Sequence, residues 1–196
     1  MKNTTAIVIL VVLSVVLAPV RVLAKFAFRA WVALTNKRAE NMPASKAKEA
    51  LEKAIASMDW HGYAVSIEES VPEEVIAKSN AGCIPMEMAS MMIGGMTVYD
   101  KKTVTFYADC IRQGAARCPW KTETALAEQI ARHENRHVQQ YTWLEARGAI
   151  GNAMLDEMFS IYGHSVLEKD AYRYQKGSKY EDDLDVVLAR YSARNE

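Results

Sequence analysis

The sequence has little cysteine and no net charge, and each shortage excludes a class of protein. Three cysteines in 196 residues are too few for a disulfide-stapled scaffold. The 24 basic residues balance the 24 acidic ones, so no electrostatic attraction to nucleic acid is expected. Apolar residues make up 50% of the chain, which is enough to fill a core and excludes a disordered protein. The length predicts one domain, at most with a membrane appendage.

The longest apolar run, residues 6–20, is short for a membrane span. It is interrupted only by Ser14 and would extend about 22 Å as a helix, against a hydrocarbon core of about 30 Å. Pro19 would end that helix, and Val22 and Ala24 are small residues typical of a signal-peptide cleavage site. We therefore expect residues 1–24 to be a signal peptide and the protein to be exported, either periplasmic or secreted.

An uncleaved membrane anchor is the alternative interpretation of the N-terminus. Basic residues are more frequent after the apolar run than before it, which would hold the domain on the cytoplasmic side of a membrane. Residues 25–43 form a linker or an amphipathic segment, in which Phe26, Ala30 and Leu34 recur at helical spacing. Membrane attachment would then involve residues 6–34.

The remaining residues, 44–196, show patterns that predict an α+β domain. Helices are expected over residues 44–58 and 123–147, from Ser165 onward and from Ser178 onward, and strands over residues 63–67, 97–99 and 103–107. The last two strands flank a polar turn and predict a β-hairpin. A helix followed by a few strands and then by helices argues against alternating β-α-β units.

One motif on the longest predicted helix carries chemistry. His133-Glu134-Asn135-Arg136-His137 places two imidazoles one helical turn apart, so that both can bind one ion. The neutral imidazole nitrogen suits zinc, and Glu134 is near enough to take a proton from a water without being a ligand. The motif therefore predicts His133 and His137 as metal ligands and Glu134 as the catalytic base.

A catalytic zinc needs a third protein ligand and an open fourth position. The leading candidate is Glu168, which follows His137 on a second predicted helix. His164 is a competing candidate. Glu168 also fits a capping box with Ser165, in which case its carboxylate would bond a backbone N–H group rather than a metal.

The segments HENRHVQQY and LEKDAYRY together resemble the gluzincin metallopeptidases, most of all small members in which HExxHxxQ is followed by Glu-x-x-Ala. The resemblance extends over roughly residues 97–175. It implies a Zn2+ cofactor held by His133, His137 and Glu168, with Glu134 as base, and a protein or peptide substrate. It also implies a compact zincin-like core, in which a small antiparallel sheet packs on the HExxH helix and on C-terminal helices. Substrate would lie along an edge strand, here residues 103–107.

The chain departs from the thermolysin pattern four residues after the third ligand. An aspartate that supports the first histidine in that pattern is replaced by Tyr172. The partner that supports the histidine is then either absent or supplied by Asp170, Asp156 or Glu128.

Two further features of the site are left open by the sequence. The group that stabilises the oxyanion is not assigned among Tyr162, His164 and Tyr172. In an oxidising compartment, Cys110 and Cys118 could close a disulfide that fixes the entrance of the metal helix.

The main hypothesis is therefore an exported or membrane-anchored zinc metallopeptidase. Its Glu134 would activate a metal-bound water for hydrolysis of peptide bonds. The alternative is a catalytically inactive zincin-like binding module, exported or attached to the membrane. The oligomeric state is not predicted.

Overall fold

The computed structural model describes residues 46–80, 93–159, 165–177 and 183–192, together with scattered positions from Leu23 to Lys37. Contacts divide the chain into two compact units, Met1–Pro43 and Ala44–Glu196. In the first unit the described residues are helical, and Leu23, Phe26 and Leu34 are exposed. No helix formed by these described residues, in either unit, is long and apolar enough to cross a membrane. The predicted signal peptide lies outside the described residues, apart from Leu23.

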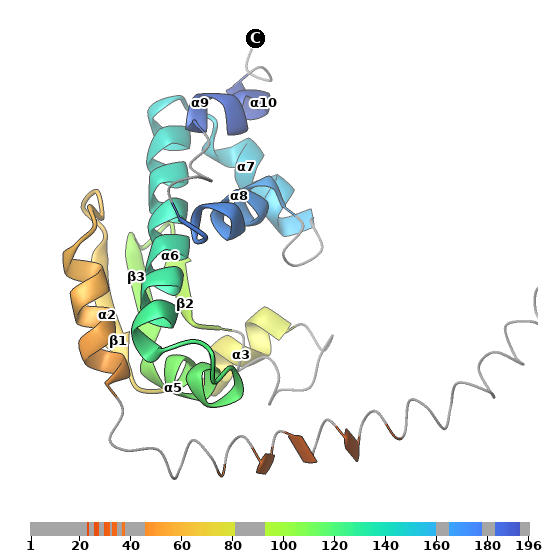
Figure 1. Cartoon of the computed structure of the whole chain (residues 1–196). Helices are drawn as coiled ribbons and strands as arrows, with labels where there is room; N and C mark the ends of the chain where they lie inside the picture. Colours follow the sequence, from red (N-terminus) through yellow and green to blue (C-terminus); the bar gives the residue numbers. More distant parts are fainter. Residues whose placement is uncertain are drawn as a thin grey trace, which may run out of the picture. The chain divides into compact units, whose positions relative to one another are not determined.

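The second unit mixes helices with a small sheet, which confirms the predicted α+β class (Figure 1). Its elements in chain order are α2 (Ala47–Ala56), β1 (Ala64–Glu68), α3 (Glu73–Asn80), β2 (Gly95–Val98), β3 (Thr103–Tyr107), α5 (Ala108–Arg117), α6 (Glu123–Ala146), α7 (Ile150–Phe159), α8 (Val166–Tyr174), α9 (Leu184–Val187) and α10 (Ala189–Ser192). The sequence predicts α2, α6, α8 and the three strands, but not α3, α5 or α7.

The sheet differs in two ways from the expected antiparallel one. Its strand order is β1-β3-β2, and β2 and β3 form the predicted antiparallel hairpin. β1, however, pairs in parallel with β3, because the chain passes through α3 between β1 and the hairpin. β3 is therefore the central strand, and Val104 and Phe106 are fully buried in it. The prediction that residues 103–107 form an edge strand is wrong, and β2 takes that position.

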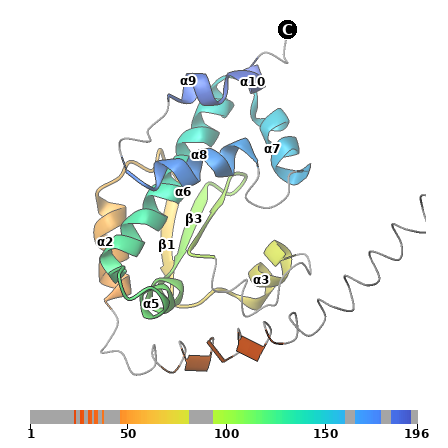
Figure 2. The ribbon, with the colours of Figure 1, turned by 45° about the vertical axis from the view of Figure 1, so that its right-hand side comes forward.

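Helix α6 organises the second unit. It begins at Thr122, whose side chain accepts a hydrogen bond from the N–H of Ala125 at 3.1 Å, and it ends before Gly148, which has a φ of 64°. It contacts α2, α5, α7, α8 and β2. Both ribbon views show α8 lying across α6 (Figures 1 and 2). The long helix predicted over residues 123–147 is thus confirmed.

The middle of α6 is buried on all sides. Five consecutive residues, from Glu134 to Val138, are at most 5% exposed, and α2, β2 and α8 all pack against α6. An amphipathic helix would bury only one face here. Four of the five residues are polar, and buried polar groups need hydrogen-bond partners. Asn135, for example, donates from Nδ2 to the carbonyl of Asp59. Buried polar side chains are therefore concentrated at one turn of α6.

The expected disulfide between Cys110 and Cys118 does not form. The two residues lie at opposite ends of α5, which the sequence does not predict. Eight residues of helix separate two Cα atoms by about 12 Å along the axis, whereas bridged cysteines have Cα atoms within about 7 Å. Burial raises the pKa of the Cys110 thiol to about 11, so this thiol stays protonated at neutral pH.

The C-terminal segment is not the continuous helix predicted from Ser178. Asp183 is extended and its side chain accepts a hydrogen bond from the N–H of Asp185, so that α9 begins at Leu184. Residues 178–182 lie outside the described residues. Leu188 and Tyr191 are buried, as the predicted apolar side of this segment requires.

Candidate metal site

Two imidazoles on α6 face each other at the centre of the site. His133 and His137 are one helical turn apart, and their Nε2 atoms are separated by 3.2 Å. The rings pack edge to face with centroids 4.8 Å apart. Two neutral nitrogen lone pairs repel each other at this distance, so the pair requires a proton or a metal cation between its members.

The third residue, Glu168, comes from the first turn of α8. Ser165 caps this helix, and its Oγ accepts a hydrogen bond from the N–H of Glu168 at 3.0 Å. The carboxylate of Glu168 points to the imidazoles. Its Oε2 lies 3.4 Å from Nε2 of His133, and its Oε1 lies 3.5 Å from Nε2 of His137. Ser165 therefore makes its half of the predicted capping box, while the glutamate side chain turns to the histidines.

His133, His137 and Glu168 form a group that could hold a metal ion. One candidate ligand atom from each lies within 4.8 Å of the others. Oε2 of Glu168 is buried and makes no hydrogen bond within the described part of the chain. A buried carboxylate oxygen without a donor is unfavourable, and a cation would satisfy it. Two imidazoles and a carboxylate are ligands typical of divalent transition metals, so the donor set fits such an ion.

Glu168 makes positive charge favourable on His137. Burial is the largest single influence on His137 and opposes its protonation, but the contacts with Glu168, Glu134 and Gln140 together outweigh burial and raise the pKa of His137 to about 9. Burial acts to raise the pKa of Glu168 as well, but its contacts with His133 and His137 prevail and lower that pKa below the usual range. The carboxylate is thus already ionised when a cation arrives.

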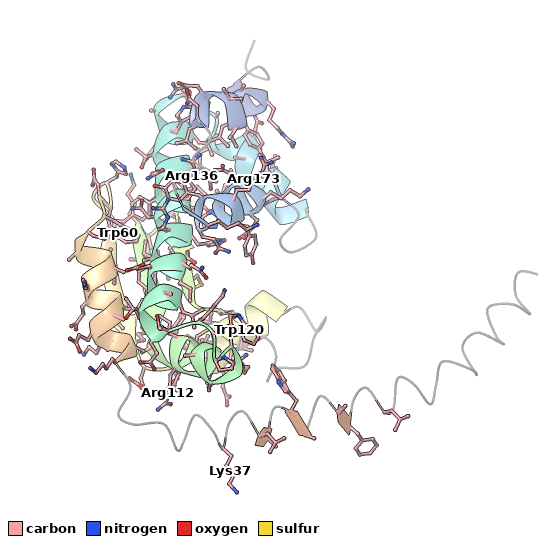
Figure 3. All side chains as sticks on the ribbon, in the orientation of Figure 1. Lys37, Trp60, Arg112, Trp120, Arg136 and Arg173 are labelled. Carbon is pink, nitrogen blue, oxygen red and sulfur yellow. The ribbon has the colours of Figure 1, made fainter. Side chains whose placement is uncertain are left out.

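A chain of hydrogen bonds supports His137 through its Nδ1 atom. Nδ1 of His137 lies 2.9 Å from Oε1 of Gln140. Nε2 of Gln140 donates to Oδ2 of Asp170 at 2.7 Å. Asp170 is paired in turn with Arg136, whose Nε and Nη2 donate to the carboxylate at 2.7 and 3.2 Å. Figure 3 labels Arg136 on α6, close to α8. A buried ion pair therefore anchors the hydrogen bonds that support His137.

The support expected for the first histidine takes a different form. Asp170 acts on His137 through Gln140, not directly on His133. Glu128 is exposed on α6, and the side chain of Asp156 lies outside the described residues. Nδ1 of His133 is buried and makes no hydrogen bond to any described group. The ring of Tyr172 lies beside His133, with centroids 4.8 Å apart.

Glu134 lies beside this group, and β2 holds its carboxylate. The side chain is 5% exposed, and its Oε2 accepts a hydrogen bond from Oγ1 of Thr97 at 2.8 Å. Gly95 leaves room for it, because a Cβ there would lie 2.6 Å from Cγ of Glu134. A Cβ at Gly94 would lie 2.4 Å from Cδ1 of Ile130. Sequence reasoning missed Thr97 and both glycines. A glycine pair at the start of a strand was the available signal, since it often marks a close approach to another element.

The four residues line one cleft of about 330 Å³ between β2, α6 and α8. The remaining lining residues are Ile93, Gly94, Gly95, Met96, Thr97, Ile130, Tyr141, Tyr172 and Gln175. Within the described residues, β2 pairs with β3 alone, so its other edge is unpaired, and Gly95, Met96 and Thr97 of this strand line the cleft. The other candidates from the sequence, His164 and Tyr162, lie outside the described residues.

Comparisons with known proteins return no match. No protein-family model, no curated protein and no solved structure is detectably similar to the chain. Function is therefore inferred from the residues of the site.

Proposed function

We propose that the protein is a zinc-dependent metallopeptidase that hydrolyses peptide bonds in protein or peptide substrates. One observation supports this above all others. His133, His137 and Glu168 converge from two helices beside the buried carboxylate of Glu134, and all four line the same cleft. Two histidines and a glutamate form a ligand set of catalytic zinc that leaves a fourth position open. The resemblance of the two motifs to gluzincins supports the same function.

The chemistry proposed for the chain is acid–base catalysis by Glu134. Zinc, when bound, would polarise the scissile carbonyl and make the attacking water more acidic. An oxygen of the Glu134 carboxylate would accept the proton of that water as the C–O bond forms. The same oxygen would return the proton to the leaving amine as the C–N bond breaks. Thr97 would hold the other carboxylate oxygen during both transfers.

The edge of β2 offers a place for the peptide substrate. Backbone groups on the outer side of an edge strand can pair with an extended peptide, which then lies as an additional strand. β2 contributes Gly95, Met96 and Thr97 to the lining of the cleft. A peptide paired with this strand would pass directly beside Glu134.

We further propose that the protein acts outside the cytoplasm or on a membrane surface. The apolar run of residues 6–20 supports a signal peptide or an anchor. The exposed apolar side chains of Phe26, Trp31 and Leu34 support membrane attachment as the alternative. N-terminal sequencing of the protein from its native compartment distinguishes the two. A terminus at Lys25 supports cleavage, and one at Met1 in the membrane fraction supports the anchor.

Zinc content of the full chain tests the metal site. We expect about one zinc per chain, lost in His133→Ala and in Glu168→Ala. His61→Ala is the matched control, because His61 pairs with Asp59 in a turn that does not line the cleft. An unmodified chain that binds no zinc would contradict the proposal.

Hydrolysis of a peptide library tests the catalytic role. Glu134→Gln should retain zinc and lose hydrolysis, since the amide cannot accept the proton. Zinc binding without hydrolysis of any library member by the unmodified chain would instead support the inactive binding module.

A further inference from the structure

Gln140 uses every polar atom of its side chain to join two of the proposed ligands. It is fully buried on α6, one turn after His137. Oε1 lies 2.9 Å from Nδ1 of His137. Nε2 donates to the carbonyl of Leu167 at 3.0 Å and to Oδ2 of Asp170 at 2.7 Å. Leu167 directly precedes Glu168, so one side chain connects the second histidine to the backbone that carries the glutamate.

The partners of Gln140 fix which end of its amide faces His137. A carbonyl and a carboxylate can only accept hydrogen bonds, so the NH₂ end must point to Leu167 and Asp170. The carboxylate of Asp170 accepts two hydrogen bonds from Arg136, which hold it in place. The carbonyl end of Gln140 therefore faces His137, and a carbonyl requires a donor. Nδ1 of His137 must carry a hydrogen, which leaves the lone pair of the neutral ring on Nε2.

The two histidines differ in this respect. Nε2 of His137 faces Glu168 and His133, which is where a metal would be held. Nδ1 of His133 has no hydrogen-bond partner within the described part of the chain, so no outer group there holds its ring in place. The site is thus oriented in advance at His137 and Glu168, and not at His133.

We propose that Gln140 is a positioning residue that fixes the Nδ1–H form of His137 and its distance from Glu168, and thereby strengthens metal binding. The expected effect of Gln140 on metal binding rests on the proposed zinc function. Its structural part, the hydrogen bond between the ring N–H and the amide, does not depend on the metal. Loss of such an outer partner of a metal-binding histidine lowers metal affinity about 10–100-fold.

Zinc affinity and the imidazole N–H signal of the full chain together test the proposal. Gln140→Met keeps the length of the side chain and removes both hydrogen-bonding ends. We expect its zinc dissociation constant, measured by chelator competition, to rise about 10–100-fold. In proton NMR, the slowly exchanging N–H of His137 should be visible in the unmodified chain, with and without zinc, and absent from Gln140→Met. A zinc affinity within about threefold of the unmodified chain, with the signal retained, would overturn the proposal.

Gln129→Met is the matched control, because Gln129 is a partly buried residue of the same helix that bonds Lys121 outside the cleft. It should leave both readouts unchanged, and an equal effect in this variant would overturn the proposal.

If Gln140→Met does not fold, Gln140→Glu is the variant that tests the proposal. Its carboxylate can accept from Nδ1–H but cannot donate to Asp170 or Leu167, so the signal should persist while the unfolding temperature falls. A folded Gln140→Glu chain without the signal would overturn the inference.

Failure of the zinc function is recognised separately. If the unmodified chain binds no zinc, the N–H signal of the zinc-free chain still decides the role of Gln140. A signal that is present in the unmodified chain and lost in Gln140→Met then supports the positioning role while the peptidase proposal fails.

Discussion

Thr97 and Glu134 are joined by a hydrogen bond of 2.8 Å, in which the threonine hydroxyl donates to Oε2 of the carboxylate. The two residues come from β2 and α6, and 37 positions separate them in the chain. This bond fixes a buried carboxylate beside two imidazoles and leaves its second oxygen for chemistry. It also connects the edge strand, where a peptide would lie, with the proposed catalytic base.

Replacing Thr97 with valine should slow hydrolysis without removing the metal. Valine has the same shape but no donor, so Glu134 loses its orientation. A hydrogen bond to a charged group contributes about 1.5–3 kcal/mol, so kcat should fall about 10–100-fold. Steady-state kinetics alongside zinc analysis provide the measurement. Thr97→Ser keeps the hydroxyl and should retain most of the activity, and equal kcat values in the valine variant and the unmodified chain would contradict the assignment.

Gly95 should not tolerate even one added methyl group. A Cβ there would lie 2.6 Å from Cγ of Glu134, so β2 or the carboxylate would have to shift. We expect Gly95→Ala to lower the free energy of unfolding by about 1–3 kcal/mol, as overpacking does. Gly151→Ala is the control, because nothing lies within 4 Å of its Cβ position in α7, and alanine should be neutral or stabilising there. Urea unfolding measures both, and equal stabilities of the two variants would contradict the close approach.

Local patterns predict the part of the site that lies on α6. His133, Glu134 and His137 follow from one motif, and the helix that carries them follows from the apolar spacing and the Thr122 cap. Helix periodicity is a local property of the sequence, so it can be recognised without knowledge of the fold. Glu168 could be singled out because a glutamate on a second helix after the motif resembles the gluzincin pattern, and the Ser165 cap marks where that helix starts.

The residues that support the site could not be predicted, because their contacts are distant in the chain. Gln140 meets Leu167 and Asp170 only once α8 packs on α6. Thr97 meets Glu134 only because β2 is the edge strand, whereas the sequence places β3 there. Strand order depends on the parallel pairing of β1 with β3. Periodicity cannot reveal that pairing, since it reports which face of a strand is buried but not its neighbours.

The ion pair of Arg136 with Asp170 should be important for stability. Both residues are at most 4% exposed, so removal of one leaves a buried charge without a partner. We expect Arg136→Met to cost about 3–5 kcal/mol in the free energy of unfolding. Arg147→Met is the control, because the pair of Arg147 with Asp185 is exposed and should contribute about 1 kcal/mol or less. Urea titration of both variants provides the comparison, and similar losses in the two would show that burial does not determine the effect.

Zinc affinity should rise with pH up to about 9 because His137 must lose a proton to bind a metal. Burial lowers the pKa of His137, but the contacts with Glu168, Glu134 and Gln140 together outweigh it and raise this pKa from 6.5 to about 9, so most of the chains carry this proton at neutral pH. Glu168, whose pKa is lowered, is already ionised and releases none. Release of one proton strengthens binding about tenfold per pH unit below pH 9.

The pair of protonated His137 with Glu168 also makes the stability of the zinc-free chain depend on pH. This dependence runs in the opposite direction to that of the zinc affinity. Because the pKa of His137 is raised on folding, its contribution is complete below pH 6.5 and is lost as the pH rises through about 9. The unfolding temperature without zinc should therefore fall over this range, while the increase produced by saturating zinc grows. Calorimetry at pH 6, 7 and 8, with and without zinc, measures both trends. A zinc-induced increase that is constant across these values would show that His137 does not exchange a proton for the metal.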